Sequence, residues 1–262
     1  MTEEPPLPAA FPDPTPDPPL DPAPNPVLPD PEPEPFPFWG FGDLFLVAAL
    51  SVPCMLAGWA AVRFLMWILH VRKLPPAFEI VPEMLLGYVL ICLVVATVFR
   101  VQYGKPFWRS MGWIPTGVPL AWNILAGFGA SFLVVLVGLA VHAPKTEGPM
   151  MEMMKNRPTL ILLAVFGTTA APLFEELGFR GFLQPLLVRY VGAIAGIGLA
   201  AALFGGLHFW EYGDSWSSSL MVAVAGAAFG LMRHRTQSTK AAVIMHSAFN
   251  ALSFISLFSQ KP

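Results

Sequence analysis

Apolar stretches follow one another along most of the chain, separated by short segments, most of which contain Lys or Arg. A helix needs about 20 apolar residues to cross a hydrocarbon core roughly 30 Å thick. Seven stretches reach or approach that length, covering residues 40–62, 83–103, 119–142, 159–182, 191–210, 217–232 and 240–258. Lipid cannot pair backbone polar groups, and no alternating barrel pattern appears, so helices are expected. The pattern predicts an all-α, polytopic transmembrane bundle of seven spans, or eight if residues 63–70 or 182–190 form a separate element.

The first 38 residues have a different character. They contain sixteen of the 29 prolines and eight acidic residues, with no Lys or Arg. Proline breaks helices and sheet ladders, and the segment has little apolar surface to bury. We expect residues 1–38 to be a disordered, acidic, proline-rich tail and residues 39–262 to be a transmembrane helical domain. A flexible tether is the preferred role for the tail, and a ligand for a partner's groove is the alternative.

The composition supports a lipid environment. Hydrophobic residues make up 55% of the chain and charged residues 12%, whereas a soluble domain has roughly 25% charged residues. We therefore expect a multi-pass integral membrane protein in contact with the bilayer, and the short loops and small size suit a bacterial inner membrane. No nucleic-acid partner is expected. Basic residues lie on both sides of successive predicted spans, so the positive-inside rule assigns no orientation.

Two adjacent carboxylates, Glu175 and Glu176, lie within an apolar run. An ionisable group at membrane depth is costly and usually faces the protein interior. Glu176 and Arg180 have the i, i+4 spacing of a facing ion pair. Neighbours on a helix point about 100° apart, which leaves Glu175 as the freer group and a candidate general base for water. The alternative is a Glu-Arg clamp without catalysis.

Two histidines follow on later apolar segments. Phe204 and His208 share a helix face at i, i+4, and so do His246 and Asn250. A histidine and an amide inside an apolar helix can stabilise a developing oxyanion. Alternatively, His208 is an ordinary interfacial residue, and His246 and Asn250 form hydrogen bonds that hold helices together.

These side chains fit hydrolytic chemistry in two ways. Glu, His, His and Asn supply a base for water and donors for a tetrahedral intermediate. Glu175, His208 and His246 also match the ligand types of hydrolytic zinc centres, so zinc or another divalent metal is an alternative to no cofactor. No HExxH, GxSxG or P-loop motif occurs in the sequence.

Three motifs in order resemble the type II CAAX prenyl endopeptidase family, also called CPBP or ABI intramembrane peptidases. Residues 175–180 resemble its EExxxR motif, residues 204–208 its FxxxH motif and residues 246–250 its HxxxN motif. Residues 229–238 also resemble that family, so the resemblance covers roughly residues 100–258. It implies a helical membrane core around a polar cavity, and hydrolysis of a peptide bond.

The resemblance also implies roles for the motif residues. Glu175 would activate water, and His208 would assist it or bind a metal. His246 and Asn250 would line the oxyanion hole, with His246 as an alternative metal ligand. Glu176, Arg180 and Phe204 would support them. The resemblance implies either a metal-dependent or a glutamate-dependent mechanism.

The leading functional hypothesis is an intramembrane endopeptidase that cleaves a membrane-associated protein or peptide tail, as in CAAX processing. The alternative is a non-catalytic membrane scaffold or bacteriocin immunity protein that binds peptide in the same pocket. A transporter is disfavoured because no repeated hydrophobic halves are visible. Two GxxxG patterns, at Gly192–Gly196 and Gly226–Gly230, are interpreted as helix packing.

One geometric difficulty remains in this prediction. Glu175 lies late in the predicted span 159–182, and His208 lies late in the span 191–210. In two simple antiparallel helices these ends would point to opposite faces of the membrane. The two side chains can meet only if both lie well inside, or if residues 182–190 are not a plain turn.

Overall fold

The computed structural model describes residues 35–143 and 148–259, and this part of the chain contains helices and no strand. The predicted all-α class is confirmed. The elements, in chain order, are α1 (Phe41–Ile68), α2 (Pro76–Tyr103), α3 (Phe107–Ser110), α4 (Leu120–Ala140), α5 (Pro149–Met153), α6 (Arg157–Thr168), α7 (Ala170–Glu176), the π-helical η1 (Leu177–Leu183), α8 (Gln184–Val191), α9 (Ala193–Leu207), α10 (Trp216–Thr236) and α11 (Thr239–Ser259). Most of the predicted tail, residues 1–34, lies outside the described residues.

Five helices in the described part of the chain are long and apolar enough to cross a membrane. They are α1, α2, α4, the continuous run from α6 to α8, and α11. The predicted spans 191–210 and 217–232 correspond to α9 and α10. α9 has only 15 residues, and α10 begins with serines and ends with basic residues, so neither meets the length and hydropathy of a candidate span.

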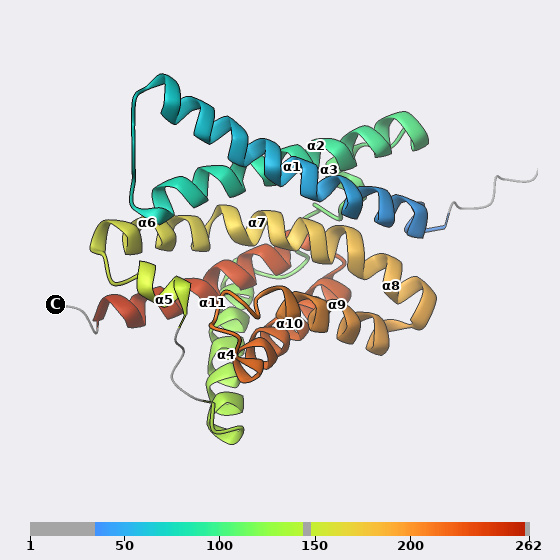
Figure 1. The fold of residues 1–262 in the computed structure, drawn as a ribbon. Coiled ribbons are helices and arrows are strands. Elements are labelled where there is room, and N and C mark those ends of the chain that lie inside the picture. Colours follow the sequence, from blue (N-terminus) through green and yellow to red (C-terminus); the bar gives the residue numbers. More distant parts are fainter. Residues whose placement is uncertain (1–34, 144–147, 260–262) are drawn as a thin grey trace, which may run out of the picture. The chain divides into compact units, whose positions relative to one another are not determined.

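The longest helical run extends from Arg157 to Val191 without a loop (Figure 1, the yellow and orange helices labelled α6, α7 and α8). Its 35 residues would extend about 52 Å at 1.5 Å per residue, more than the hydrocarbon core requires. Residues 182–190 are therefore not a turn, because η1 and α8 continue the helix. Glu175 lies near the middle of this run.

Gly192 turns the chain sharply from α8 into α9. Its φ of +81° lies in the region that favours glycine. The two helices pack closely, since a Cβ on Gly196 would lie 2.6 Å from the backbone nitrogen of Val188. Glu176 lies 16 residues before Gly192 and His208 lies 16 residues after it. An antiparallel hairpin with this spacing returns His208 to the level of Glu176, which resolves the geometric difficulty in the sequence prediction.

The remaining helices pack on this hairpin or on one another. α10 packs along α9, α11 packs against α4, α6 and α7, and the α1–α2 hairpin contacts α6 and α7 through α2. Residues just before α1 also belong to this packing. Trp39 is 1% exposed and lies in a cluster with Phe99 and Phe182. Its indole Nε1 donates a hydrogen bond to the Phe182 carbonyl at 3.2 Å, so the entry to α1 is attached to η1.

Candidate active site

A buried ion pair forms the base of the candidate site. Glu176 and Arg180 are both fully buried, and Arg180 Nη1 donates to Glu176 Oε1 at 3.0 Å. Arg180 Nη2 donates to the Gly226 carbonyl at 2.7 Å, and the guanidinium carbon lies 4.6 Å from the centre of the Phe204 ring. A buried charge pair needs such additional partners to offset its desolvation. The i, i+4 pair expected from the sequence is therefore present and held from α10.

The glycines of α10 contribute more than close packing. Arg180 bonds to the Gly226 carbonyl, and Gln184 Nε2 donates to the Gly230 carbonyl at 2.9 Å. A Cβ on Gly226 would lie 3.0 Å from Arg180 Nη2, and one on Gly230 would lie 2.7 Å from Gln184 Oε1. The second GxxxG pattern thus leaves room for two polar side chains to reach backbone carbonyls.

His246 lies between the two carboxylates. Its Nδ1 is 2.9 Å from Glu176 Oε1, and its Nε2 is 3.9 Å from Glu175 Oε2. Because a carboxylate can only accept, Nδ1 carries a proton, and Nε2 faces Glu175. The imidazole stacks on Phe229 at 4.4 Å between ring centroids. α11 therefore presents His246 in one orientation to a site on α7.

Glu175 is the accessible member of the carboxylate pair. Its side chain is 19% exposed, whereas that of Glu176 is fully buried. The 3.9 Å between its Oε2 and His246 Nε2 is too long for a direct hydrogen bond. One water bonded to both atoms fits this separation. Glu175 is therefore the accessible carboxylate and Glu176 the buried one, as the helix spacing predicted.

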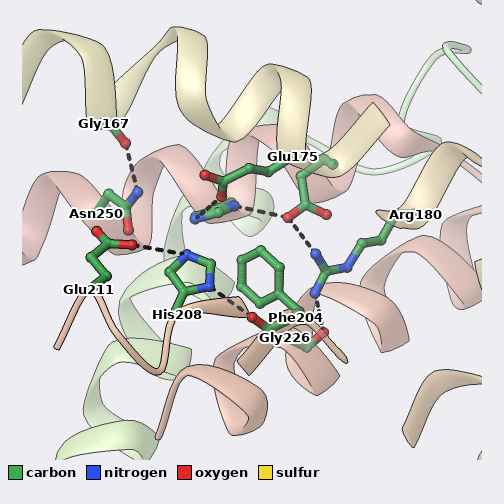
Figure 2. A network of polar contacts seen from close by, with 10 residues as sticks. Gly167, Glu175, Arg180, Phe204, His208, Glu211, Gly226 and Asn250 are labelled. Carbon is green, nitrogen blue, oxygen red and sulfur yellow. Dashed lines mark hydrogen bonds and ion pairs between the residues drawn. The ribbon is translucent and has the colours of Figure 1, made fainter. Parts of the chain in front are cut away.

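His208 belongs to the same neighbourhood but does not contact the carboxylate pair directly. Its Nδ1 donates to the Phe204 carbonyl at 2.7 Å, and its Nε2 lies 3.8 Å from Glu211 Oε2. In Figure 2 the Phe204 ring lies between His208 on one side and Arg180 on the other. Phe204 also makes an edge contact with His246, with centroids 6.0 Å apart. The predicted supporting residue Phe204 thus lies between the guanidinium of Arg180 and the two imidazoles.

Asn250 is engaged with backbone and not with the other motif side chains. Its Nδ2 donates to the Gly167 carbonyl at 2.6 Å, which joins α11 to α6 (Figure 2). This is the interhelical hydrogen bond that the sequence allowed as the alternative to an oxyanion role.

Three residues near the site were not singled out from the sequence. Glu211, Tyr88 and Tyr212 lie close enough to Glu175 for electrostatic interaction. Burial raises the pKa of Glu211, and the nearby His208 partly opposes this rise. Glu211 had a local signal, since it follows His208 at i, i+3. Tyr88 had none, because α2 reaches the site only through tertiary packing.

The predicted metal ligands are not grouped as a metal site. Within residues 35–143 and 148–259, no three His, Cys, Asp or Glu side chains are grouped so that they could hold a metal ion. The reason is visible in their partners: His246 Nδ1 is bonded to Glu176, and His208 Nε2 faces Glu211 and not Glu175.

A comparison with protein families finds one match. Residues 157–252 match the family model described as type II CAAX prenyl endopeptidase Rce1-like. No curated protein and no solved structure matches the chain. The matched segment begins at α6 and includes all three motifs, so the resemblance predicted from these motifs is confirmed there.

Proposed function

We propose that this protein is an intramembrane endopeptidase in which Glu175 activates the attacking water. The observation that carries the proposal is the pairing of a partly exposed Glu175 with His246 across 3.9 Å, backed by the buried Glu176–Arg180 pair. The match of residues 157–252 to a family of prenyl endopeptidases supports the reaction class. The substrate would be a membrane-associated protein or a peptide tail that reaches this depth.

The proposed reaction begins with a water between Glu175 Oε2 and His246 Nε2. Glu175 accepts a proton from this water while its oxygen bonds to the scissile carbonyl carbon, which gives a tetrahedral oxyanion. The proton then passes from Glu175 to the amide nitrogen and the C–N bond breaks, which gives a carboxylic acid and an amine. The acid transfers its proton to the amine, so the products are a carboxylate and an ammonium group. Glu175 returns to its starting state, so no net proton is consumed within the site.

His246 and its partners position the reacting groups. Glu176 holds the Nδ1 proton of His246 and directs Nε2 towards the water, and Arg180 compensates the charge of Glu176. A side chain fixed in this way costs little reorganisation during the reaction. Phe204 and Phe229 pack against the imidazole and limit water around it. We assign His208, oriented by Phe204 and Glu211, to positioning the substrate or water, and Asn250 to holding α11 against α6.

The test compares protein termini in membrane and secreted fractions of cells that express wild type or Glu175→Gln at equal abundance. We expect specific termini to disappear in Glu175→Gln, since loss of a general base slows hydrolysis by roughly 100-fold or more. Glu152→Gln is the matched control, because Glu152 is 67% exposed and pairs only with Lys155 among the described residues. Identical termini in all three would contradict the proposal and favour a peptide-binding scaffold or immunity protein.

A further inference from the structure

A cavity lies between α8 and the C-terminal end of α10, away from the candidate active site. It has a volume of about 240 Å³. Its polar wall consists of Gln184, Arg189, Arg233, His234 and Gln237. Apolar groups complete it: Phe36 and Pro37 from the segment before α1, and Pro185 and Val188 from α8. None of the proposed catalytic residues lines this cavity.

The described residues of the cavity wall include two arginines and no carboxylate. Arg233 is 4% exposed and bonds to neutral partners: Nε donates to Thr239 Oγ1 at 3.0 Å and Nη1 to Gln237 Oε1 at 3.4 Å. Arg189 Nη1 donates to the Pro37 carbonyl at 2.6 Å. Neither arginine forms an ion pair with a carboxylate of the described residues. Arg233 is the buried arginine of the two, whereas Arg189 is exposed. A buried guanidinium with neutral partners favours a bound anion.

The wall also contains an unsatisfied acceptor. Gln184 is 2% exposed, and its Nε2 donates a hydrogen bond to the Gly230 carbonyl. Its Oε1 has no hydrogen-bond partner in the described part of the chain. A ligand that pairs with both the arginines and the Gln184 oxygen therefore combines an anion with a neighbouring O–H or N–H donor. A phosphodiester whose headgroup ends in a hydroxyl or an ammonium has both.

The position of the cavity suits such a headgroup. The candidate span Arg157–Val191 ends at this level, and the last turn of α10 carries Arg233, His234 and Arg235. Phe36 is 52% exposed beside the cavity. Basic side chains and aromatic rings at helix ends lie at the height of lipid phosphates.

We propose that this cavity binds the phosphate of a phospholipid whose headgroup carries a hydroxyl or ammonium donor. Arg189 and Arg233 bind the phosphate oxygens, and Gln184 accepts from the headgroup donor. The bound lipid joins the ends of α8 and α10 to the segment before α1. This binding site is independent of the peptidase proposal, because it uses none of the residues assigned to hydrolysis.

The test uses the full-length protein in detergent micelles, with binding followed by native mass spectrometry. Short-chain phosphatidylglycerol is titrated, with phosphatidylcholine as the lipid that lacks a headgroup donor and inorganic phosphate as the free anion. We expect Arg189→Gln and Gln237→Glu each to weaken phosphatidylglycerol binding roughly tenfold, by removing a cation or placing a carboxylate beside Arg233. Arg235→Gln is the matched control, because Arg235 is exposed on the same helical turn and does not line the cavity.

Each alternative outcome is distinct. Equal weakening by Arg235→Gln would mean attraction to a basic surface, which overturns the cavity site. Binding of inorganic phosphate that depends on Arg189, without binding of phosphatidylglycerol, would assign the cavity to free phosphate and overturn the lipid. Equal affinity for phosphatidylcholine would overturn the role of Gln184. Circular dichroism and melting of each variant confirm that the fold is retained.

Discussion

At the scale of single residues, the site depends on two neighbouring glutamates in different surroundings. Glu176 is enclosed by Arg180 and His246, while Glu175 points to the space in which substrate and water would meet. Adjacent positions on a helix face about 100° apart, so one glutamate can be buried in a polar network while the other remains accessible. The chain thereby places the proposed general base next to its own structural support.

The Arg180→Met substitution tests this support. It would leave the Glu176 carboxylate buried without its cation, and we expect a loss of roughly 3–5 kcal/mol in stability. Thermal melting in detergent measures the loss. Arg235→Met is the control, since Arg235 is exposed at the end of α10, and a change within about 0.5 kcal/mol is expected. Equal melting of both variants would show that Arg180 does not stabilise the buried carboxylate.

At the scale of helices, close approach between α9 and α10 sets the position of His208. Gly205 lies on the contact face, where an added Cβ would be 2.4 Å from the Ser219 carbonyl oxygen. A Cβ added to the neighbouring Gly206 would meet nothing within 4 Å. His208 follows three residues after Gly205 at the end of α9. Any separation of α9 from α10 therefore moves His208 relative to Glu175.

This contact predicts opposite effects for two adjacent glycines. Gly205→Ala must push backbone against backbone, and we expect destabilisation of about 1–3 kcal/mol together with reduced cleavage. Gly206→Ala should be neutral or stabilising by up to about 1 kcal/mol, because alanine is the better helix former. Melting temperatures and cleavage of the same substrate measure both. Similar behaviour of the two variants would contradict the packing explanation.

The η1 segment is the other element that shapes the site. It replaces α-helical hydrogen bonding over Leu177–Leu183, directly after the two glutamates. π-helical turns inside α-helices occur frequently at functional sites. Within this segment, Arg180 donates to the Gly226 carbonyl of α10, and the Phe182 carbonyl accepts a hydrogen bond from Trp39. One helix thereby contacts two parts of the bundle while Glu175 remains accessible.

At the scale of the whole molecule, the segment before α1 is part of the helical unit that spans residues 35–262. Trp39 stacks on Phe182 with ring centroids 5.5 Å apart and packs against Phe99. Arg189 bonds to the Pro37 carbonyl. Residues 35–38, which the sequence assigned to the tail, thus contact α8 and the aromatic cluster around η1.

Changes on the two sides of residue 35 should therefore have different effects on stability and cleavage. Deletion of residues 2–34 is expected to leave membrane insertion, melting temperature and cleavage close to those of wild type, because the helical unit begins at residue 35. Trp39→Ala in the full chain should cost about 3–5 kcal/mol through lost aromatic burial. Loss of cleavage after the 2–34 deletion would show that the tail takes part in function and is not merely a tether.

Much of this protein is predictable from the sequence because the membrane restricts the choices. Lipid leaves backbone groups unpaired unless a helix forms, so apolar length indicated five of the spans, whereas the expected spans at α9 and α10 fall short of the criteria. Spacing at i, i+4 likewise indicated the Glu176–Arg180 pair and the separation of Glu175 from it. Motif order indicated the family that residues 157–252 match.

Tertiary structure decided how distant helices meet. Spacing along one helix cannot show that His246 approaches Glu176 from α11, that Tyr88 arrives from α2, or that Asn250 bonds to Gly167. It also could not show that η1 and α8 extend the helix to Gly192, which brings His208 back to the level of Glu176. Sequence patterns describe local faces, whereas these contacts depend on crossing angles and depths that only the packed bundle determines.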